Sequence, residues 1–222
     1  MIRAELHLHT HYSVDCALSP ETILKAAAAR GLNCLAVTDH NSLRGAFEVQ
    51  NIARIRIIPG EEIKTREGEI IGLFLLEQIP RRLSAEETVK RIKEQGGLVY
   101  IPHPFDRLRG SRLRREVLFE IAPQVDIIEV FNSRVTFPRD NRLAEEFAQR
   151  FGLARGGGSD AHTAYEIGRT VVEIADFSTP SEFLAALREG TVKGHLSLPV
   201  VHAMSTLRKL RRRAFRRIQT DG

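Results

Sequence analysis

The stretch that decides the fold lies near the start of the chain, where residues 2–37 read IRAELHLHTHYSVDCALSPETILKAAAARGLNCLAV. Its two ends, Ile2–Leu8 and Leu35–Val37, are short apolar runs typical of buried strands. Between them, a serine N-cap, a proline at the first helical position and a final Gly31 predict a helix over Pro20–Arg30. The order strand, helix, strand predicts one unit of a parallel α/β fold.

The same alternation continues along most of the chain. We expect further strands over Ile55–Pro59, Ile70–Leu76, Leu98–Ile101 and Val125–Phe131, and a short one at Ala154-Arg155. We expect further helices over Leu43–Ile52, Ser84–Gln95, Arg139–Phe151 and Pro180–Arg188. Because the sequence has no internal repeat and no low-complexity linker, it predicts one domain over residues 1–195 and a C-terminal extension over residues 196–222.

Composition predicts a soluble, cytoplasmic protein. With 222 residues, of which 42% are hydrophobic, the chain can form one well-filled core. No run of 18 apolar residues indicates a transmembrane helix, and the residues after Met1 do not resemble a secretory signal. Cys16 and Cys34 lack a CxxC spacing, which indicates buried thiols in a reducing compartment.

The basic charge is concentrated near the C-terminal end. Seven of the 33 Lys and Arg residues lie between Leu207 and Ile218, where there is no acidic residue. The rest of the chain is nearly neutral, which excludes a basic nucleic-acid-binding body. Leu207, Leu210, Ala214 and Ile218 predict an amphipathic helix. Three interpretations of it stay open: docking on the body, attraction of nucleic acid, and attachment to an anionic membrane surface.

Side chains that bind metals follow the predicted strands where the strands end. His7 and His9 share one face of the first strand, because side chains alternate along a strand, and Leu6 and Leu8 take the other face. The other groups are Thr38-Asp39-His40, Gly60-Glu61-Glu62, Pro102-His103-Pro104, Glu129 with Asn132-Ser133-Arg134, and Gly158-Ser159-Asp160-Ala161-His162. In a parallel barrel these strand ends meet at one mouth, so we expect a single site there.

Each of these residues also has an ordinary structural interpretation. A single His or Asp at a strand end is usually a turn former or a satisfied polar group, and successive glycines can form a tight turn. Taken together, however, the converging imidazoles and carboxylates would be buried without partners unless cations compensate them. Mixed imidazole and carboxylate ligands suit Zn, Mn or Fe, so the pattern predicts divalent metal ions.

The ordered motifs resemble those of the PHP (polymerase and histidinol phosphatase) family. They are His7-Leu8-His9-Thr10, Thr38-Asp39-His40-Asn41, Gly60-Glu61-Glu62, Pro102-His103-Pro104 and Ser159-Asp160-Ala161-His162. Each motif alone is weak evidence, whereas the complete set, in order over nearly the whole body, is specific. The resemblance implies an α/β fold, a distorted TIM-like (β/α)7 barrel, with a phosphoesterase site of two or three divalent ions (Mn, Zn or Fe).

The resemblance also implies which residues hold the ions. His7, His9, Glu62 and Asp160 would hold one ion; Glu62 would bridge to a second, also held by His103; Asp15, His40 and His162 would hold a third. Asp15 stands one residue later than in the commonest version of its motif. Glu69 stands where many relatives have a histidine, and two interpretations stay open: a carboxylate ligand, or an exposed charge at a hairpin.

The chemistry indicated is that of metal ions, because the sequence has no Gly-x-Ser-x-Gly motif, no catalytic cysteine signature and no Walker loop. Paired ions activate a water and clamp phosphoryl oxygens. Asp160 or His162 would protonate the leaving oxygen or orient the water, and His11 and Asp39 would orient ligands. We expect Arg134 to hold the phosphate; the alternative is an ordinary surface arginine.

The favoured function is hydrolysis of a small phosphorylated or nucleotide substrate, by a phosphatase or a short-oligonucleotide nuclease. The body is too short for a polymerase, and the histidinol phosphatase branch is usually longer and richer in histidine ligands. The alternative from another class is a non-catalytic, metal-stabilised module that binds nucleic acid or a partner through the basic C-terminal tail. The sequence leaves the substrate and the oligomeric state open.

Overall fold

Strands and helices alternate along the described part of the chain, which comprises residues 1–198, 200, 201, 205 and 207 of this computed structural model. The strands are β1 (Ile2–Leu8), β2 (Cys34–His40), β3 (Arg56–Lys64), β4 (Glu69–Leu73), β5 (Leu98–Ile101), β6 (Ile127–Asn132), β7 (Ala154–Gly158), β8 (Thr170–Ile174) and β9 (Thr191–Gly194). The helices are α1 (Pro20–Ala29), α2 (Arg44–Ile52), α3 (Ala85–Glu94), α4 (Arg115–Ile121), α5 (Pro138–Phe151) and α6 (Pro180–Arg188), with a 3₁₀ turn, η1 (Ala122–Gln124). All the strands and helices predicted within residues 1–195 are present, whereas α4, β8 and β9 lie in segments where the sequence predicts none. Among the described residues, no helix has the length and apolar character needed to cross a membrane.

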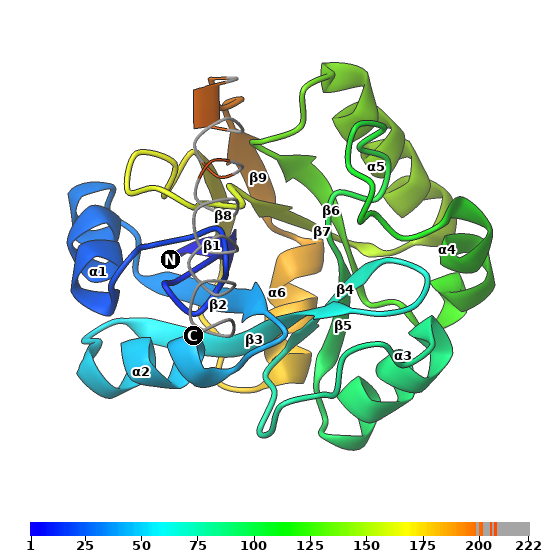
Figure 1. Ribbon diagram of the computed structural model, residues 1–222, viewed down its shortest axis with the longest axis horizontal. Coiled ribbons are helices and arrows are strands. Elements are labelled where there is room, and N and C mark those ends of the chain that lie inside the picture. Colours follow the sequence, from blue (N-terminus) through cyan, green and yellow to red (C-terminus); the bar gives the residue numbers. More distant parts are fainter. Residues whose placement is uncertain (199, 202–204, 206, 208–222) are drawn as a thin grey trace, which may run out of the picture.

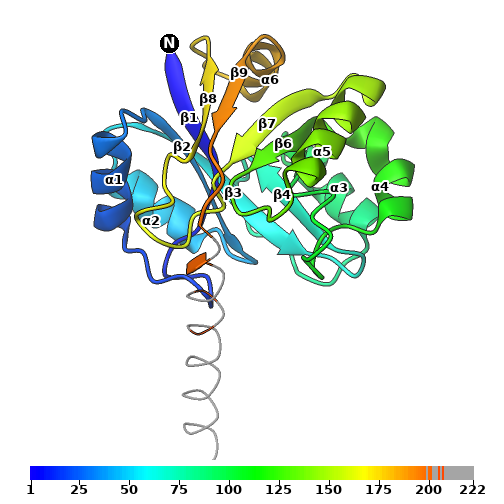
Figure 2. The ribbon, with the colours of Figure 1, turned by 90° about the horizontal axis from the view of Figure 1, so that it is seen from above.

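Strands β1 to β7 curl into a nearly closed barrel (Figure 1, Figure 2). The sheet order is β7-β6-β5-β4-β3-β2-β1-β8-β9. The chain that follows β7 returns to β1, where the amides of His9 and Asp160 donate to the carbonyl oxygens of Ala161 and His7 at 3.0 and 2.8 Å. The predicted α/β fold, a distorted TIM-like barrel, is therefore confirmed.

The distortion comes from β4, which runs antiparallel to both of its neighbours. β3 and β4 are joined by a tight turn instead of a helix, and in this turn the amide of Thr65 donates to the carbonyl oxygen of Gly68 at 2.8 Å. The remaining neighbours from β1 to β3 and from β5 to β7 pair in parallel. β8 and β9 add an antiparallel extension beside β1. Most strands of the barrel therefore end at the same mouth.

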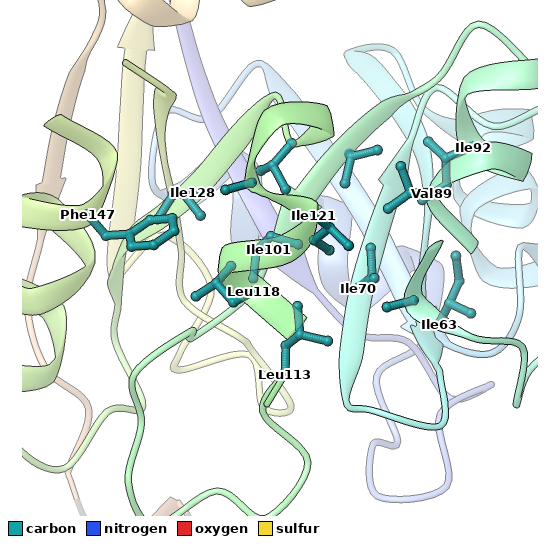
Figure 3. Packing of buried hydrophobic residues seen from close by; sticks show 14 of the residues in the cluster. Ile63, Ile70, Val89, Ile92, Ile101, Leu113, Leu118, Ile121, Ile128 and Phe147 are labelled. Carbon is teal, nitrogen blue, oxygen red and sulfur yellow. The ribbon is translucent and has the colours of Figure 1, made fainter. Parts of the chain in front are cut away.

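Apolar side chains fill the barrel and the space beneath its outer helices. The interior cluster contains inward-facing strand residues such as Ala36, Ile71 and Tyr100. Phe183 and Leu187 of α6 belong to the same cluster, and α6 lies near the N-terminal end of β1 (Figure 2). A second cluster packs α3, α4 and α5 onto the outer side of the sheet (Figure 3). Because α6 covers one end of the barrel, the opposite end is left for polar side chains.

A β-bulge in β1 changes which of its side chains face the interior near this open mouth. The pairing of β1 with β2 shifts between Glu5 and Leu8, so Leu6 packs in the interior cluster while Leu8 packs in an outer one. The prediction that Leu6 and Leu8 share a face is therefore wrong, because one extra residue changes the alternation. The bulge brings His7 to the interior side. The pairing of β6 with β7 shifts in the same way next to Glu129.

The described residues of the C-terminal extension contact the barrel. The amide of Ser197 donates to the carbonyl oxygen of Ser133 at 2.6 Å, and Val201 is buried. Apart from Leu207, the basic run lies outside the described residues. The amphipathic helix expected there, and the domain boundary after residue 195, stay predictions.

Candidate metal centre

Four side chains surround one point at the mouth of the barrel. The Nε2 atoms of His7 and His9 lie 3.3 Å apart. Nε2 of His7 lies 3.8 Å from Oδ1 of Asp160 and 3.6 Å from Oε2 of Glu62. Nε2 of His9 lies 3.3 Å from the same Asp160 oxygen and 3.5 Å from the same Glu62 oxygen. Tetrahedral ligands at about 2.1 Å from a metal ion are about 3.4 Å from one another. The four atoms therefore have the spacing of a ligand shell.

A second group shares Glu62 with the first. Oε1 of Glu62 lies 3.1 Å from Nε2 of His103, and that nitrogen lies 3.9 Å from Oε2 of Glu69. Glu69 is only 6% exposed, so the alternative of an exposed charge at a hairpin is wrong. Its interpretation as a carboxylate ligand stays a prediction. Glu62 thus offers one oxygen to each of two groups.

A third group contains the aspartate that departs from the commonest motif. Oδ1 of Asp15 lies 3.6 Å from Nε2 of His40 and 3.4 Å from Nε2 of His162. Nδ1 of His40 lies 2.9 Å from Oε2 of Glu62, which links this group to the first. The structure therefore brings all nine predicted ligands together: His7, His9, Asp15, His40, Glu62, Glu69, His103, Asp160 and His162.

Four carboxylate oxygens in this cluster are buried without a hydrogen bond to any described residue. They are Oδ1 of Asp15, Oε2 of Glu62, Oε2 of Glu69 and Oδ1 of Asp160. Each such atom costs about 1–3 kcal/mol or more when it has no partner. All four lie next to ring nitrogens of other candidate ligands, where cations would satisfy them. The residues present therefore fit a set of divalent ions.

Glu129 holds two of the candidate ligands in place. It lies 3.0 Å from Nδ1 of His7 and accepts hydrogen bonds from the Tyr100 hydroxyl at 3.0 Å and from the His103 amide at 2.7 Å. A proton on Nδ1 of His7, donated to Glu129, leaves the Nε2 lone pair facing the other ligands. The sequence placed Glu129 near the mouth, and the structure adds its contacts.

Asp39 reaches His9 through one intervening side chain. Its carboxylate accepts hydrogen bonds from the amide and hydroxyl of Thr10 and from the hydroxyl of Ser13, at 2.8, 2.6 and 2.5 Å. The same Ser13 hydroxyl lies 3.2 Å from Nδ1 of His9. These contacts fit the expected orienting role of Asp39. His11 lies farther out, with Nε2 3.6 Å from Glu48.

The ionisable groups of the cluster shift one another strongly. Burial and two neighbouring imidazoles lower the pKa of His9 to about 3. Burial opposes the protonation of His7, but three carboxylates outweigh it and raise the pKa of His7 well above its ordinary value. Burial also opposes the ionisation of Asp160, and the cations of Arg109 and His7 nevertheless lower the pKa of Asp160. Each charge here depends on an opposite charge beside it.

Arg134, the expected phosphate-binding residue, is buried beside the third group. Its side chain is 5% exposed, so the alternative of an ordinary surface arginine is wrong. Nη1 lies 2.7 Å from Nδ1 of His162, and Nη2 donates to the Val201 carbonyl oxygen at 3.0 Å and to the Ser205 hydroxyl at 2.7 Å. Nε lies 3.3 Å from Oε1 of Glu166. Its role in holding phosphate stays a prediction.

Arg109 also reaches the cluster, although it belongs to none of the residues predicted for the site. It lies in the loop between β5 and α4, and its Nη2 donates to Oδ2 of Asp160 at 2.5 Å. A loop arginine belongs to no motif, which explains why it was missed. The signal that points to it is the density of arginines over Arg107–Arg115, directly after the Pro102-His103-Pro104 motif.

Known proteins with a similar sequence or fold support this description. The PHP-associated family model matches residues 138–192, which include Asp160 and His162. A protein of Methanocaldococcus jannaschii named uncharacterized protein MJ0417 is 36% identical over 197 residues, covering 84% of this chain and 79% of the relative. A two-domain protein of Bacteroides vulgatus, containing a predicted PHP-like metal-dependent phosphoesterase, superposes with a TM-score of 0.71. The chain belongs to the PHP family.

This PHP chain covers only part of some similar proteins. The superposition with the Bacteroides vulgatus protein covers 87% of this chain and 65% of that one. The two sequences are 22% identical over it, so the similarity concerns the fold. The 5'-3' exoribonuclease of Haemophilus influenzae is 34% identical over 98 residues, covering 41% of this chain and 35% of the relative. The resemblance to the PHP family that the motifs indicate is confirmed.

Proposed function

We propose that this PHP protein is a metal-dependent phosphoesterase that hydrolyses a small phosphorylated or nucleotide substrate. The observation that carries the proposal is the set of buried carboxylate oxygens that lie beside imidazole nitrogens and, in the part of the chain that the structure describes, lack a hydrogen bond. A purely structural metal site is normally closed by four ligands. Here the ligand groups adjoin and share Glu62, an arrangement suited to several adjacent ions with open positions.

The proposed ligands follow from the three groups of side chains. His7, His9, Glu62 and Asp160 would hold the first ion; Glu62, Glu69 and His103 the second; and Asp15, His40 and His162 the third. When bound, such ions supply a water that is nucleophilic at neutral pH and a positive environment for phosphoryl oxygens. Glu129 and Asp39 orient the imidazoles that would hold them.

Proton transfer and phosphate binding would fall to residues beside these ligands. His162 lies between Asp160 and Arg134, with Nδ1 2.8 Å from the Asp160 carbonyl oxygen. We therefore assign Asp160 or His162 to proton transfer to the leaving oxygen or to orientation of the water. Arg134 lies within reach of the same region, and we retain it as a residue that would hold phosphate.

A cavity beside His40 is large enough for the organic part of a substrate. Its volume is about 580 Å³, and its lining includes Tyr12, Val14, Asn41, Gln78 and Arg81. Pockets of about 300–1,000 Å³ hold small molecules and cofactors. The aromatic, amide and guanidinium groups suit a nucleotide, and a nuclease is among the similar proteins. We therefore propose a phosphatase of nucleotides or a nuclease of short oligonucleotides.

The test combines metal analysis with a phosphomonoester assay. Protein reconstituted with manganese should contain two or three ions per chain and should hydrolyse a generic phosphomonoester. The control variant is His195→Ala, which should keep the metal content and activity of the wild-type protein. This histidine is exposed and lies beside β9, outside the three ligand groups. A content below one ion per chain in carefully reconstituted protein would contradict the proposal.

A further inference from the structure

A guanidinium group lies inside the cluster of candidate ligands. It belongs to Arg109, whose amide donates to the Asp106 carbonyl oxygen at 3.2 Å in the loop between β5 and α4. Its side chain is 18% exposed, with Nη2 bonded to Oδ2 of Asp160 and Nε 3.6 Å from Oδ2 of Asp106. Asp160 turns its other oxygen, Oδ1, toward His9 at 3.3 Å. Arg109 thus binds the carboxylate oxygen that the imidazoles leave free.

The charges around Arg109 leave it a role when metal ions are bound. The carboxylates of Asp15, Glu62, Glu69 and Asp160 carry four negative charges when ionised, and Asp106 and Glu129 beside them add two. Three divalent ions would neutralise these six charges, and the guanidinium of Arg109 would then remain as an additional positive charge at the mouth. A phosphoryl dianion needs such an excess of positive charge in its binding site.

The Arg109 guanidinium has N–H donors available for a ligand, whereas the Arg134 guanidinium already uses its donors in other contacts. A guanidinium has five N–H donors. Among the described residues, the Arg109 side chain makes one hydrogen bond, to Asp160. The Arg134 guanidinium contacts a carbonyl oxygen, a hydroxyl and an imidazole, and it is 5% exposed against 18% for Arg109. Arg109 can therefore bind a ligand at the mouth without giving up an existing contact.

We propose that Arg109 binds the phosphoryl group of the substrate through its free N–H donors, while Nη2 keeps its bond to Asp160. The proposal rests on the phosphoesterase function proposed above. The ligand it assigns is a tetrahedral oxyanion, either a phosphate ester or the inorganic phosphate released from it. A planar guanidinium suits this ligand because it can donate to two phosphoryl oxygens at once.

The experiment measures binding of inorganic phosphate, so it does not depend on turnover. The manganese-loaded full chain is titrated with phosphate in a calorimeter, beside Arg109→Ala, Arg109→Lys and Arg112→Ala. Arg112 is a matched control because it lies in the same loop and donates to the Asp106 carbonyl oxygen at 3.3 Å. Arg109→Ala should weaken phosphate binding at least about tenfold, Arg109→Lys by less, and Arg112→Ala by less than about twofold.

The bound metal, measured in the same samples, separates phosphate binding from a structural role. Unchanged metal content with weaker phosphate binding supports the proposal. Wild-type phosphate affinity in fully loaded Arg109→Ala overturns it and leaves Arg134 as the candidate. Loss of metal from both Arg109→Ala and Arg109→Lys also overturns it, because Arg109 would then act only by positioning Asp160. If the wild-type protein hydrolyses no phosphoester while Arg109→Ala still loses phosphate binding, the proposed function fails and the assignment of Arg109 stands.

Discussion

His9 is fully buried among charged and polar groups, an arrangement that an ordinary protein core disfavours. Its ring centroid lies 4.5 Å from that of His40 and 4.3 Å from that of His162. Because its pKa is lowered to about 3, the ring is neutral at physiological pH. Neutral imidazole is the form that binds metal ions.

Replacing His9 by alanine tests the first ligand group. His9→Ala removes one of four ligands, so we expect a loss of about one ion per chain and a fall in kcat/KM of more than about 100-fold. Circular dichroism should show a folded barrel, because His9 lies at the mouth and outside the apolar clusters. Near wild-type turnover at saturating metal would refute this ligand assignment.

Glu129→Gln tests a residue that acts through His7. The variant keeps the size of the side chain. Its amide NH₂ group, however, would face a group that now donates a hydrogen bond to the Glu129 carboxylate, so two donors would oppose each other. We expect metal affinity to fall by about 10–100-fold, measured by competition with a chelating dye. Glu145→Gln, a substitution on α5 that lies outside the ligand cluster and contacts Arg155, should leave the affinity unchanged. Equal affinities in the two variants would show that Glu129 does not position His7.

At the scale of secondary structure, the approach of β7 to β1 depends on a residue without a side chain. A Cβ at Gly158 would lie 2.2 Å from Cβ of His7 and 2.6 Å from Oε1 of Glu129. Both distances are too short for real atoms, and neither partner is the free end of a flexible surface side chain. Glycine here is therefore required by the close approach of the strands.

Gly158→Ala should damage stability and metal binding together. We expect the free energy of unfolding to fall by about 1–3 kcal/mol in urea titrations, because overpacking must displace His7 or β1. Metal affinity should fall in the same variant. Gly110→Ala is the control, since a Cβ at Gly110 would have no described atom within 4 Å. Wild-type stability and metal content in Gly158→Ala would mean that the strands lie farther apart.

At the scale of the whole molecule, the ligand cluster joins strands that are distant in sequence. Four candidate ligands lie on successive strands: His7 on β1, His40 on β2, Glu62 on β3 and Glu69 on β4. The other candidate ligands lie in the segments that follow β1, β5 and β7. Bound ions would therefore hold the mouth of the barrel together across both halves. Without ions, the buried carboxylates repel one another.

Removal of metal should lower the thermal stability of the whole barrel. A ligand present at 100 times its Kd stabilises the folded state by about 2.7 kcal/mol, which is about 5–10 °C in Tm for a chain of this size. Dialysis against EDTA should lower the Tm by at least this much, and added manganese should restore it. An unchanged Tm with demonstrably removed metal would contradict the predicted ion-binding cluster.

The sequence alone determined the class of fold and the set of candidate ligands. Strand periodicity, the serine N-caps and the ordered motifs depend on neighbouring residues, so they can be read locally. The antiparallel β4 was beyond this reasoning, because strand direction depends on pairing. β8 pairs with β1, which is far away in the chain, and β9 pairs only with β8, so neither strand was identified from the sequence.

Tertiary structure decided which groups of ligands form and which arginine lies among them. The bulge in β1, which brings His7 to the interior side, arises from register between strands and leaves no local signal. Arg109 and Asp160 are 51 residues apart and meet only because the barrel closes. Side-chain contacts between distant segments depend on packing of the whole chain. For that reason the sequence predicted the candidate ligands of this site, whereas the burial of Glu69 and Arg134 and the contact of Arg109 required the structure.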